Sequence, residues 1–198
     1  MTTDRMETLA ELQARLARAK EELREQRESE ILVDAAGVVA EQILHETHPD
    51  ADSIAIIAYH ESGHLRMLQL RFLPAAAIRI EFADGRLLGV ACPDWRLIDA
   101  QPTTTDAQNA GARLRACESV GVHLDLDSLI EKTEKLVRGD WPKIQRIGEF
   151  VASVCYSQNG NDWRVVVSAE TLERLFWTEH QWRAEYGIEQ HEEDPCEA

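Results

Sequence analysis

Apolar residues at helical spacing dominate the start of the chain and predict a helix over residues 5–30. This segment is rich in Ala, Leu, Glu, Arg and Gln and contains neither Gly nor Pro. Its apolar residues follow a short heptad pattern, with a seam made of Leu9, Leu12, Leu16, Ala19 and Leu23. Such a helix either associates with a second copy of the chain or packs on its own domain, and the pattern leaves both possibilities open.

A second helix is predicted for residues 30–45, where apolar residues form a face broad enough for burial. The residues that follow, HPDAD at 48–52, end this helix, because Pro49 disfavours the helical conformation in the residue before it. Asp52 or Ser53 is then suited to cap a new helix.

Residues 53–73 fit two structures. As a hairpin, two strands would flank a turn at Ser62 and Gly63. As a helix, the segment would run from a cap near Asp52 to Pro74. Gly63 would then cost about 1 kcal/mol relative to alanine, unless close packing of another element requires it. Periodicity alone does not decide between the two.

The remainder of the chain alternates strand, loop and helix signals. A β-hairpin is predicted over residues 78–90, with ADG at 83–85 as its turn. Further helices are expected at about 105–120, 129–137, 143–154 and 168–186, with a short strand at 163–167. We therefore expect an α+β fold that is mostly helical and has one small sheet. Its predicted parts are an N-terminal helix over 1–30, a domain over 31–186 and an acidic tail over 187–198.

Composition narrows the classes of function. The 198 residues carry 36 acidic and 21 basic side chains, a formal charge of −15 that argues against nucleic-acid binding through a basic face. No window approaches the run of about 18 apolar residues that a membrane span needs, and the first residues lack the apolar core of a secretory signal. The four cysteines form no Cys-x-x-Cys pair, which favours reduced thiols and a cytoplasmic location.

The motif His-Glu-x-x-His at residues 60–64 is the main candidate for chemistry. On a helix, positions four apart share a face, so His60 and His64 would present two imidazoles to one zinc ion. Glu61 would lie beside that metal as a general base for a water molecule. If the segment formed a hairpin instead, this chemistry would be lost.

The surroundings of this motif resemble the peptidase domain of FtsH-type AAA proteases. AYHESGH at 58–64 is similar to the Ala-Tyr-His-Glu-Ala-Gly-His of that family. FLP at 72–74 and GRLLGV at 85–90 resemble the Leu-Val-Pro and Gly-Arg-Ala-Leu-Gly-Val blocks that follow in the same order. The phosphate-binding loop of the family's ATPase module is missing from the sequence.

The resemblance implies a mostly helical, zincin-like metallopeptidase domain that binds Zn²⁺. TDAQNAG at 105–111 is similar to the stretch that holds the family's third ligand, so the resemblance makes Asp106 a ligand beside His60 and His64, with Glu61 as general base. A peptide or an unfolded protein is the implied substrate, and self-association through the N-terminal helix is an open expectation. Considered without the resemblance, Asp106 is equally a residue that favours a helix N-terminus. The alternatives are a non-enzymatic acidic interaction module and a purely structural metal site.

Overall fold

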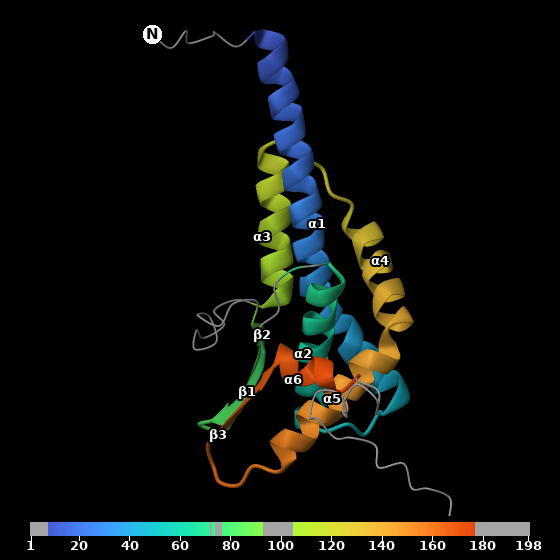
Figure 1. Ribbon diagram of the computed structural model, residues 1–198, viewed down its shortest axis with the longest axis vertical. Coiled ribbons are helices and arrows are strands. Elements are labelled where there is room, and N and C mark those ends of the chain that lie inside the picture. Colours follow the sequence, from blue (N-terminus) through green and yellow to red (C-terminus); the bar gives the residue numbers. More distant parts are fainter. Residues whose placement is uncertain (1–7, 72, 74–76, 93–104, 177–198) are drawn as a thin grey trace, which may run out of the picture.

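The computed structural model describes residues 8–71, 73, 77–92 and 105–176, and its architecture is α+β, as predicted (Figure 1). The helices are α1 (Leu9–Thr47), α2 (Ser53–Leu70), α3 (Asp106–Ser119), α4 (Leu126–Gly139), α5 (Trp141–Tyr156) and α6 (Ala169–Arg174). The strands are β1 (Ala77–Ala83), β2 (Arg86–Cys92) and β3 (Trp163–Ser168). None of the described helices combines the length and the apolar character that a membrane span requires.

Helix α1 is continuous over 39 residues, so the prediction of two helices meeting near residue 30 was wrong. Thr8 begins it with a capping box, in which the Thr8 side chain accepts from the Glu11 backbone N–H and the Glu11 carboxylate accepts from that of Thr8. The sequence near residue 30 changes from a narrow apolar seam to a broad apolar face. No Gly or Pro accompanies this change, and the Ser29 hydroxyl donates to the Glu25 carbonyl of the preceding turn, so the helix continues and only its packing partners differ. The predicted domain boundary at residue 30 falls inside it.

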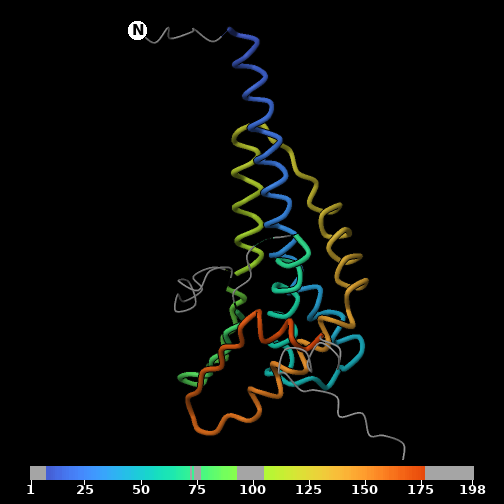
Figure 2. Tube along the Cα trace, in the orientation of Figure 1, coloured from blue at the N-terminus to red at the C-terminus, as the bar shows by residue number. Residues whose placement is uncertain are grey.

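The first turns of α1 extend beyond the other described elements (Figure 2). Leu9, Leu12 and Leu16 are 72%, 43% and 58% exposed, whereas Leu23 packs against the buried core. This part of the heptad seam therefore does not pack on its own domain. Its association with a second copy stays a prediction.

Residues 53–70 form helix α2, so the hairpin alternative is wrong. The Asp52 side chain caps the helix by accepting from the Ala55 N–H at 2.9 Å. Gly63 lies where α2 crosses α1, and a Cβ on it would be 2.5 Å from the Ala36 carbonyl oxygen. Close packing of another helix thus explains the mid-helix glycine.

The three strands form one antiparallel sheet in the order β2-β1-β3. In the predicted hairpin, Ala83 pairs with Arg86 and Ala77 with Cys92. Asp84 and Gly85 connect the strands with φ angles of +52° and +74°, the conformation of a tight hairpin turn. Strand β3 pairs with β1, and β2 consequently forms an edge of the sheet that lies against α2.

Helix α2 separates two hydrophobic clusters and lies at the centre of the fold. One cluster joins α1 to α3 and α4, and the other joins α2 to the sheet, α5 and α6. Helices α4 and α5 and strand β3 confirm the predicted elements of the C-terminal half. The end of the last predicted helix and the acidic tail lie outside the described residues.

Candidate metal centre

Helix α2 brings His60 and His64 together one turn apart, and α3 adds Asp106 as its first residue. Nε2 of His60 lies 3.1 Å from Nε2 of His64 and 3.0 Å from Oδ2 of Asp106. Nε2 of His64 lies 3.4 Å from the same oxygen. Three potential ligand atoms thus form a compact triangle.

The triangle has the dimensions of a zinc site. Ligand atoms about 2.0–2.1 Å from a tetrahedral zinc lie roughly 3.3 Å from one another. The three sides, 3.0, 3.1 and 3.4 Å, agree with that spacing. Two imidazoles and one carboxylate also form a donor set that zinc accepts, and a set of three leaves a position for water or substrate. The dimensions and the donor atoms of the described residues therefore fit a metal ion held by three protein ligands.

Both imidazoles are held by contacts from α1 to their other ring nitrogen. Nδ1 of His64 lies 2.7 Å from the Val33 carbonyl oxygen, to which it can only donate. Nδ1 of His60 lies 3.3 Å from Oε2 of Glu41. Such partners fix the tautomer with the proton on Nδ1 and leave Nε2 free to bind a metal.

Gly37 of α1 provides the space between the two rings. A Cβ at this position would lie 2.4 Å from Nε2 of His64 and 2.8 Å from Nε2 of His60. These are the two nitrogen atoms that face the shared centre. A glycine is therefore required for α1 to approach the rings at this distance.

Asp106 owes its position to the start of α3 and to ion pairs between α3 and α1. Thr105 caps α3 with a capping box, which places Asp106 at the first helical position. Nε of Arg113 donates to Oδ2 of Asp34 at 2.8 Å, and the same guanidinium contacts Glu30. Asp106 is thus both a helix N-terminal residue and a neighbour of the histidines, so the two readings of the sequence are compatible.

Charges in the triangle stabilise one another. Burial alone would lower the pKa of His64, but the hydrogen bond that its ring donates to Asp106 and the charges of Glu61 and Asp106 raise it to about 9. Burial would raise the pKa of Asp106, yet its contacts with His60 and His64 hold it well below the ordinary value. In the absence of metal, a protonated His64 and an ionised Asp106 therefore form an ion pair.

The side chain of Glu61 extends from α2 to the edge strand β2. Only 5% of its surface is exposed, and this burial raises the pKa of its carboxyl group against the lowering effect of the two histidines. The Ala91 N–H of β2 donates to the carboxylate. A Cβ at Gly89 would lie 2.6 Å from Oε1 of Glu61, so β2 approaches this close because residue 89 is a glycine.

Other histidines and carboxylates of the described residues do not join the triangle. His45 and His48 are exposed near the end of α1, and Glu118 is exposed near the end of α3. Asp94 and Asp99, two carboxylates that precede Asp106 in the sequence, lie outside the described residues.

Sequence reasoning missed two residues of α1 at this centre. An isolated glycine inside a predicted apolar helix is a recognisable signal of close packing, and it could have drawn attention to Gly37. Glu41 gave no comparable signal, because it resembles any polar residue of an amphipathic helix.

Comparison of the chain with protein-family models, with curated proteins and with solved structures gave no significant match. The function must therefore be argued from the arrangement of these residues.

Proposed function

We propose that the chain is a zinc-dependent metallopeptidase, in which His60, His64 and Asp106 hold the metal and Glu61 is the general base. The observation that carries the proposal is the triangle of two imidazole nitrogens and one carboxylate oxygen, with sides of 3.0 to 3.4 Å. Its two histidines lie on α2, the helix that also presents Glu61. Glutamate directly after the first histidine is the arrangement of zinc hydrolases of the His-Glu-x-x-His class.

Zinc bound here would polarise a substrate carbonyl and lower the pKa of a water molecule toward neutrality. Glu61 would accept a proton from the attacking water and pass it to the leaving amine. Its buried position suits this role, because a raised pKa brings the carboxyl group closer to the working pH of a general base. Glu41 and the Val33 carbonyl would keep the imidazoles oriented throughout.

Peptides in extended conformation are the substrates we propose. Strand β2 is an edge of the sheet and contacts Glu61 through Ala91 and Gly89, so a peptide added to this edge would pass beside the base. Unfolded proteins and short peptides would meet this requirement. Cys117 and Cys155 carry free thiols, which agrees with the cytoplasmic setting that we include in the proposal.

Metal content and peptide cleavage test the proposal together. Protein purified without a His-tag and offered zinc should retain about one equivalent, and His64→Ala and Asp106→Ala should each weaken zinc binding at least tenfold. Glu61→Gln should keep the metal and abolish cleavage of a quenched-fluorescence peptide library. Glu131→Gln, which removes an exposed carboxylate from α4, is the matched control and should change neither property.

Each unfavourable result has a separate meaning. Failure of the wild-type chain to bind zinc refutes the proposal as a whole. Zinc binding without cleavage by the wild-type chain identifies a structural metal. Cleavage that persists in Glu61→Gln excludes Glu61 as the base.

A further inference from the structure

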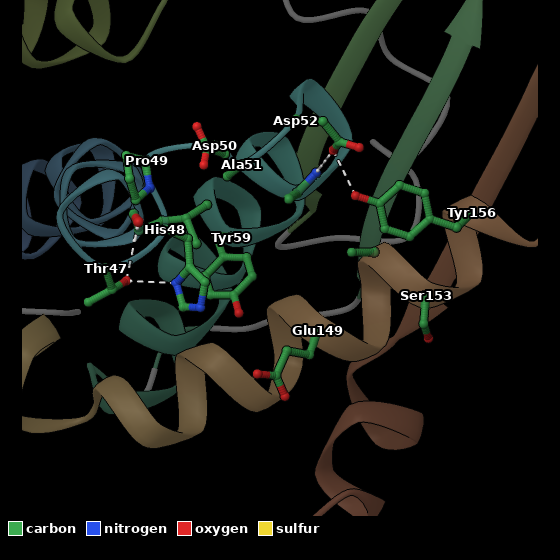
Figure 3. Close-up of a pocket in the computed structure, with 13 residues that line it drawn as sticks. Thr47, His48, Pro49, Asp50, Ala51, Asp52, Tyr59, Glu149, Ser153 and Tyr156 are labelled. Atoms are coloured by element: carbon green, nitrogen blue, oxygen red, sulfur yellow. Dashed lines mark hydrogen bonds between the residues drawn. The ribbon is translucent and has the colours of Figure 1, made fainter.

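A concave site distinct from the metal centre lies where the α1–α2 connection meets α5 (Figure 3). Its volume is about 710 Å³, within the range of ligand-binding clefts. The α1–α2 connection at residues 47–52 forms one wall, and α5 forms the opposite wall with Glu149, Ser153 and Tyr156. None of its lining residues belongs to the triangle.

Tyr59 supplies an unsatisfied polar group to this cleft. Only 5% of its surface is exposed, and its ring packs on Gly148 and lies 5.7 Å from the Trp141 ring. The hydroxyl forms no hydrogen bond with any described residue and points toward Glu149 in the cleft (Figure 3). The ring of Tyr59 is buried, but its hydroxyl is not among the fully enclosed polar atoms of the described residues, so this oxygen is accessible from the cleft and available to a ligand.

The charges that line the cleft have one dominant sign. Asp50, Asp52 and Glu149 bring three carboxylates, and no described lining residue is a lysine or an arginine. Asp52 is used to cap α2 and accepts a hydrogen bond from Tyr156 at 2.7 Å. Glu149 accepts only an uncharged amide hydrogen bond, from Gln145, and forms no ion pair with a described residue. His48 lines the rim, where its Nδ1 contacts the Thr47 hydroxyl.

Part of the lining is apolar. Leu44 of α1, Ala55 of α2 and Ala152 of α5 contribute side chains without polar atoms. A ligand that fits all of these groups has an apolar stem and one compact cation. Its hydrogen-bond donors would reach the Tyr59 oxygen and the Glu149 carboxylate.

We propose that this cleft binds a protonated primary amine on an apolar stem, with the ammonium group between the Tyr59 hydroxyl and Glu149. An ammonium suits this position because it offers three donors and no acceptor. The amine would belong either to a free alkylamine or to a lysine side chain of a peptide. This site is independent of the metallopeptidase proposal.

Chemical-shift titrations of the full-length chain test the site with two amine probes. The first probe is n-hexylamine, with n-hexanol as the uncharged control, and the second is the peptide acetyl-Ala-Lys-Ala-amide, with norleucine in place of lysine as its control. We expect saturable shifts at residues 44–59 and 149–156 for at least one amine and much weaker binding for its control. Tyr59→Phe, which keeps the ring packing, should weaken binding about fivefold. Glu149→Gln should weaken it by at least as much.

The outcomes separate cleanly. Binding of the free amine or of the peptide supports the site and identifies the source of the ligand. Absence of saturable binding by both amines overturns it, as does equal binding of hexylamine and hexanol. Affinity that is unchanged in both Tyr59→Phe and Glu149→Gln also overturns it, and Glu131→Gln is the control that should bind like the wild type.

Discussion

Replacing Gly37 with alanine should abolish metal binding while helix α1 stays folded. In an exposed or open helical position, alanine is more favourable than glycine by about 1 kcal/mol. At Gly37 the added methyl group would lie 2.4 Å from Nε2 of His64 and 2.8 Å from Nε2 of His60. Ordinary contact begins at about 3.4 Å, so at least one ring must move by about 1 Å.

A displacement of that size is large for a metal site. Ligand distances in real sites agree with the ideal values to about 0.2 Å, so the triangle could no longer hold zinc with all three atoms. We expect zinc affinity to fall by at least 100-fold, equivalent to about 3 kcal/mol. Competition titration against a chromophoric zinc chelator measures this change directly, and thermal unfolding of the metal-free protein monitors the fold.

Gly111→Ala is the matched control. Gly111 lies within α3, and a Cβ there would meet only the end of the Arg115 side chain at 3.4 Å. This variant should gain up to about 1 kcal/mol in stability and keep its zinc affinity. If Gly37→Ala bound zinc as tightly as Gly111→Ala, the inference that the two Nε2 atoms share a metal next to Gly37 would be refuted.

Three further predictions concern the ion pair between Arg113 and Asp34, the exposed apolar seam of α1 and the N-terminal cap of α2. Arg113→Met should leave the buried Asp34 carboxylate unpaired and cost roughly 1–3 kcal/mol in urea unfolding, whereas Arg138→Met, which breaks exposed contacts with Glu46, should cost clearly less in the same assay. If the exposed seam mediates self-association, Leu12→Ser with Leu16→Ser should shift sedimentation equilibrium toward the monomer; a wild-type chain that is monomeric at all concentrations contradicts this. Asp52→Ala should cost about 1 kcal/mol at pH 7. Because the contacts of Asp52 lower its pKa below 3.8, that difference should persist above this pH and disappear as the pH falls through the lowered value; a pH-independent difference would contradict it.

Local sequence patterns predicted the secondary structure well wherever an element packs against the same partners along its whole length. The hairpin turn at Asp84 and Gly85, the start of α3 at Thr105 and the start of α5 at Trp141 all follow from short-range signals. The continuity of α1 did not follow, because the change in its apolar pattern marks a change of packing partner and not the end of a helix. The choice between helix and hairpin at Gly63 depended on the approach of α1, which periodicity does not contain.

In the candidate site, too, the residues that are close in sequence were predicted more easily than those that other elements contribute. The spacing of His60, Glu61 and His64 is local, so their shared position at the candidate centre depended only on the formation of helix α2. Asp106 comes from 46 residues further along the chain than His60, and only the family resemblance suggested it. The contribution of α1 was harder to predict, because Gly37 signals only that another element packs closely and Glu41 resembles any polar residue of an amphipathic helix.

Helix α1 is a wall of the proposed metal centre and not an appendage to it. Val33, Gly37 and Glu41 are spaced four residues apart, so they share the face of α1 that lies along α2. The first contact orients His64, the second opens the space between the rings, and the third contacts His60. The exposed seam at Leu9 to Leu16 belongs to the same continuous helix. A partner bound to that seam would therefore contact the helix that holds both imidazoles in place. Association and metal binding should therefore be measured together in any variant of α1.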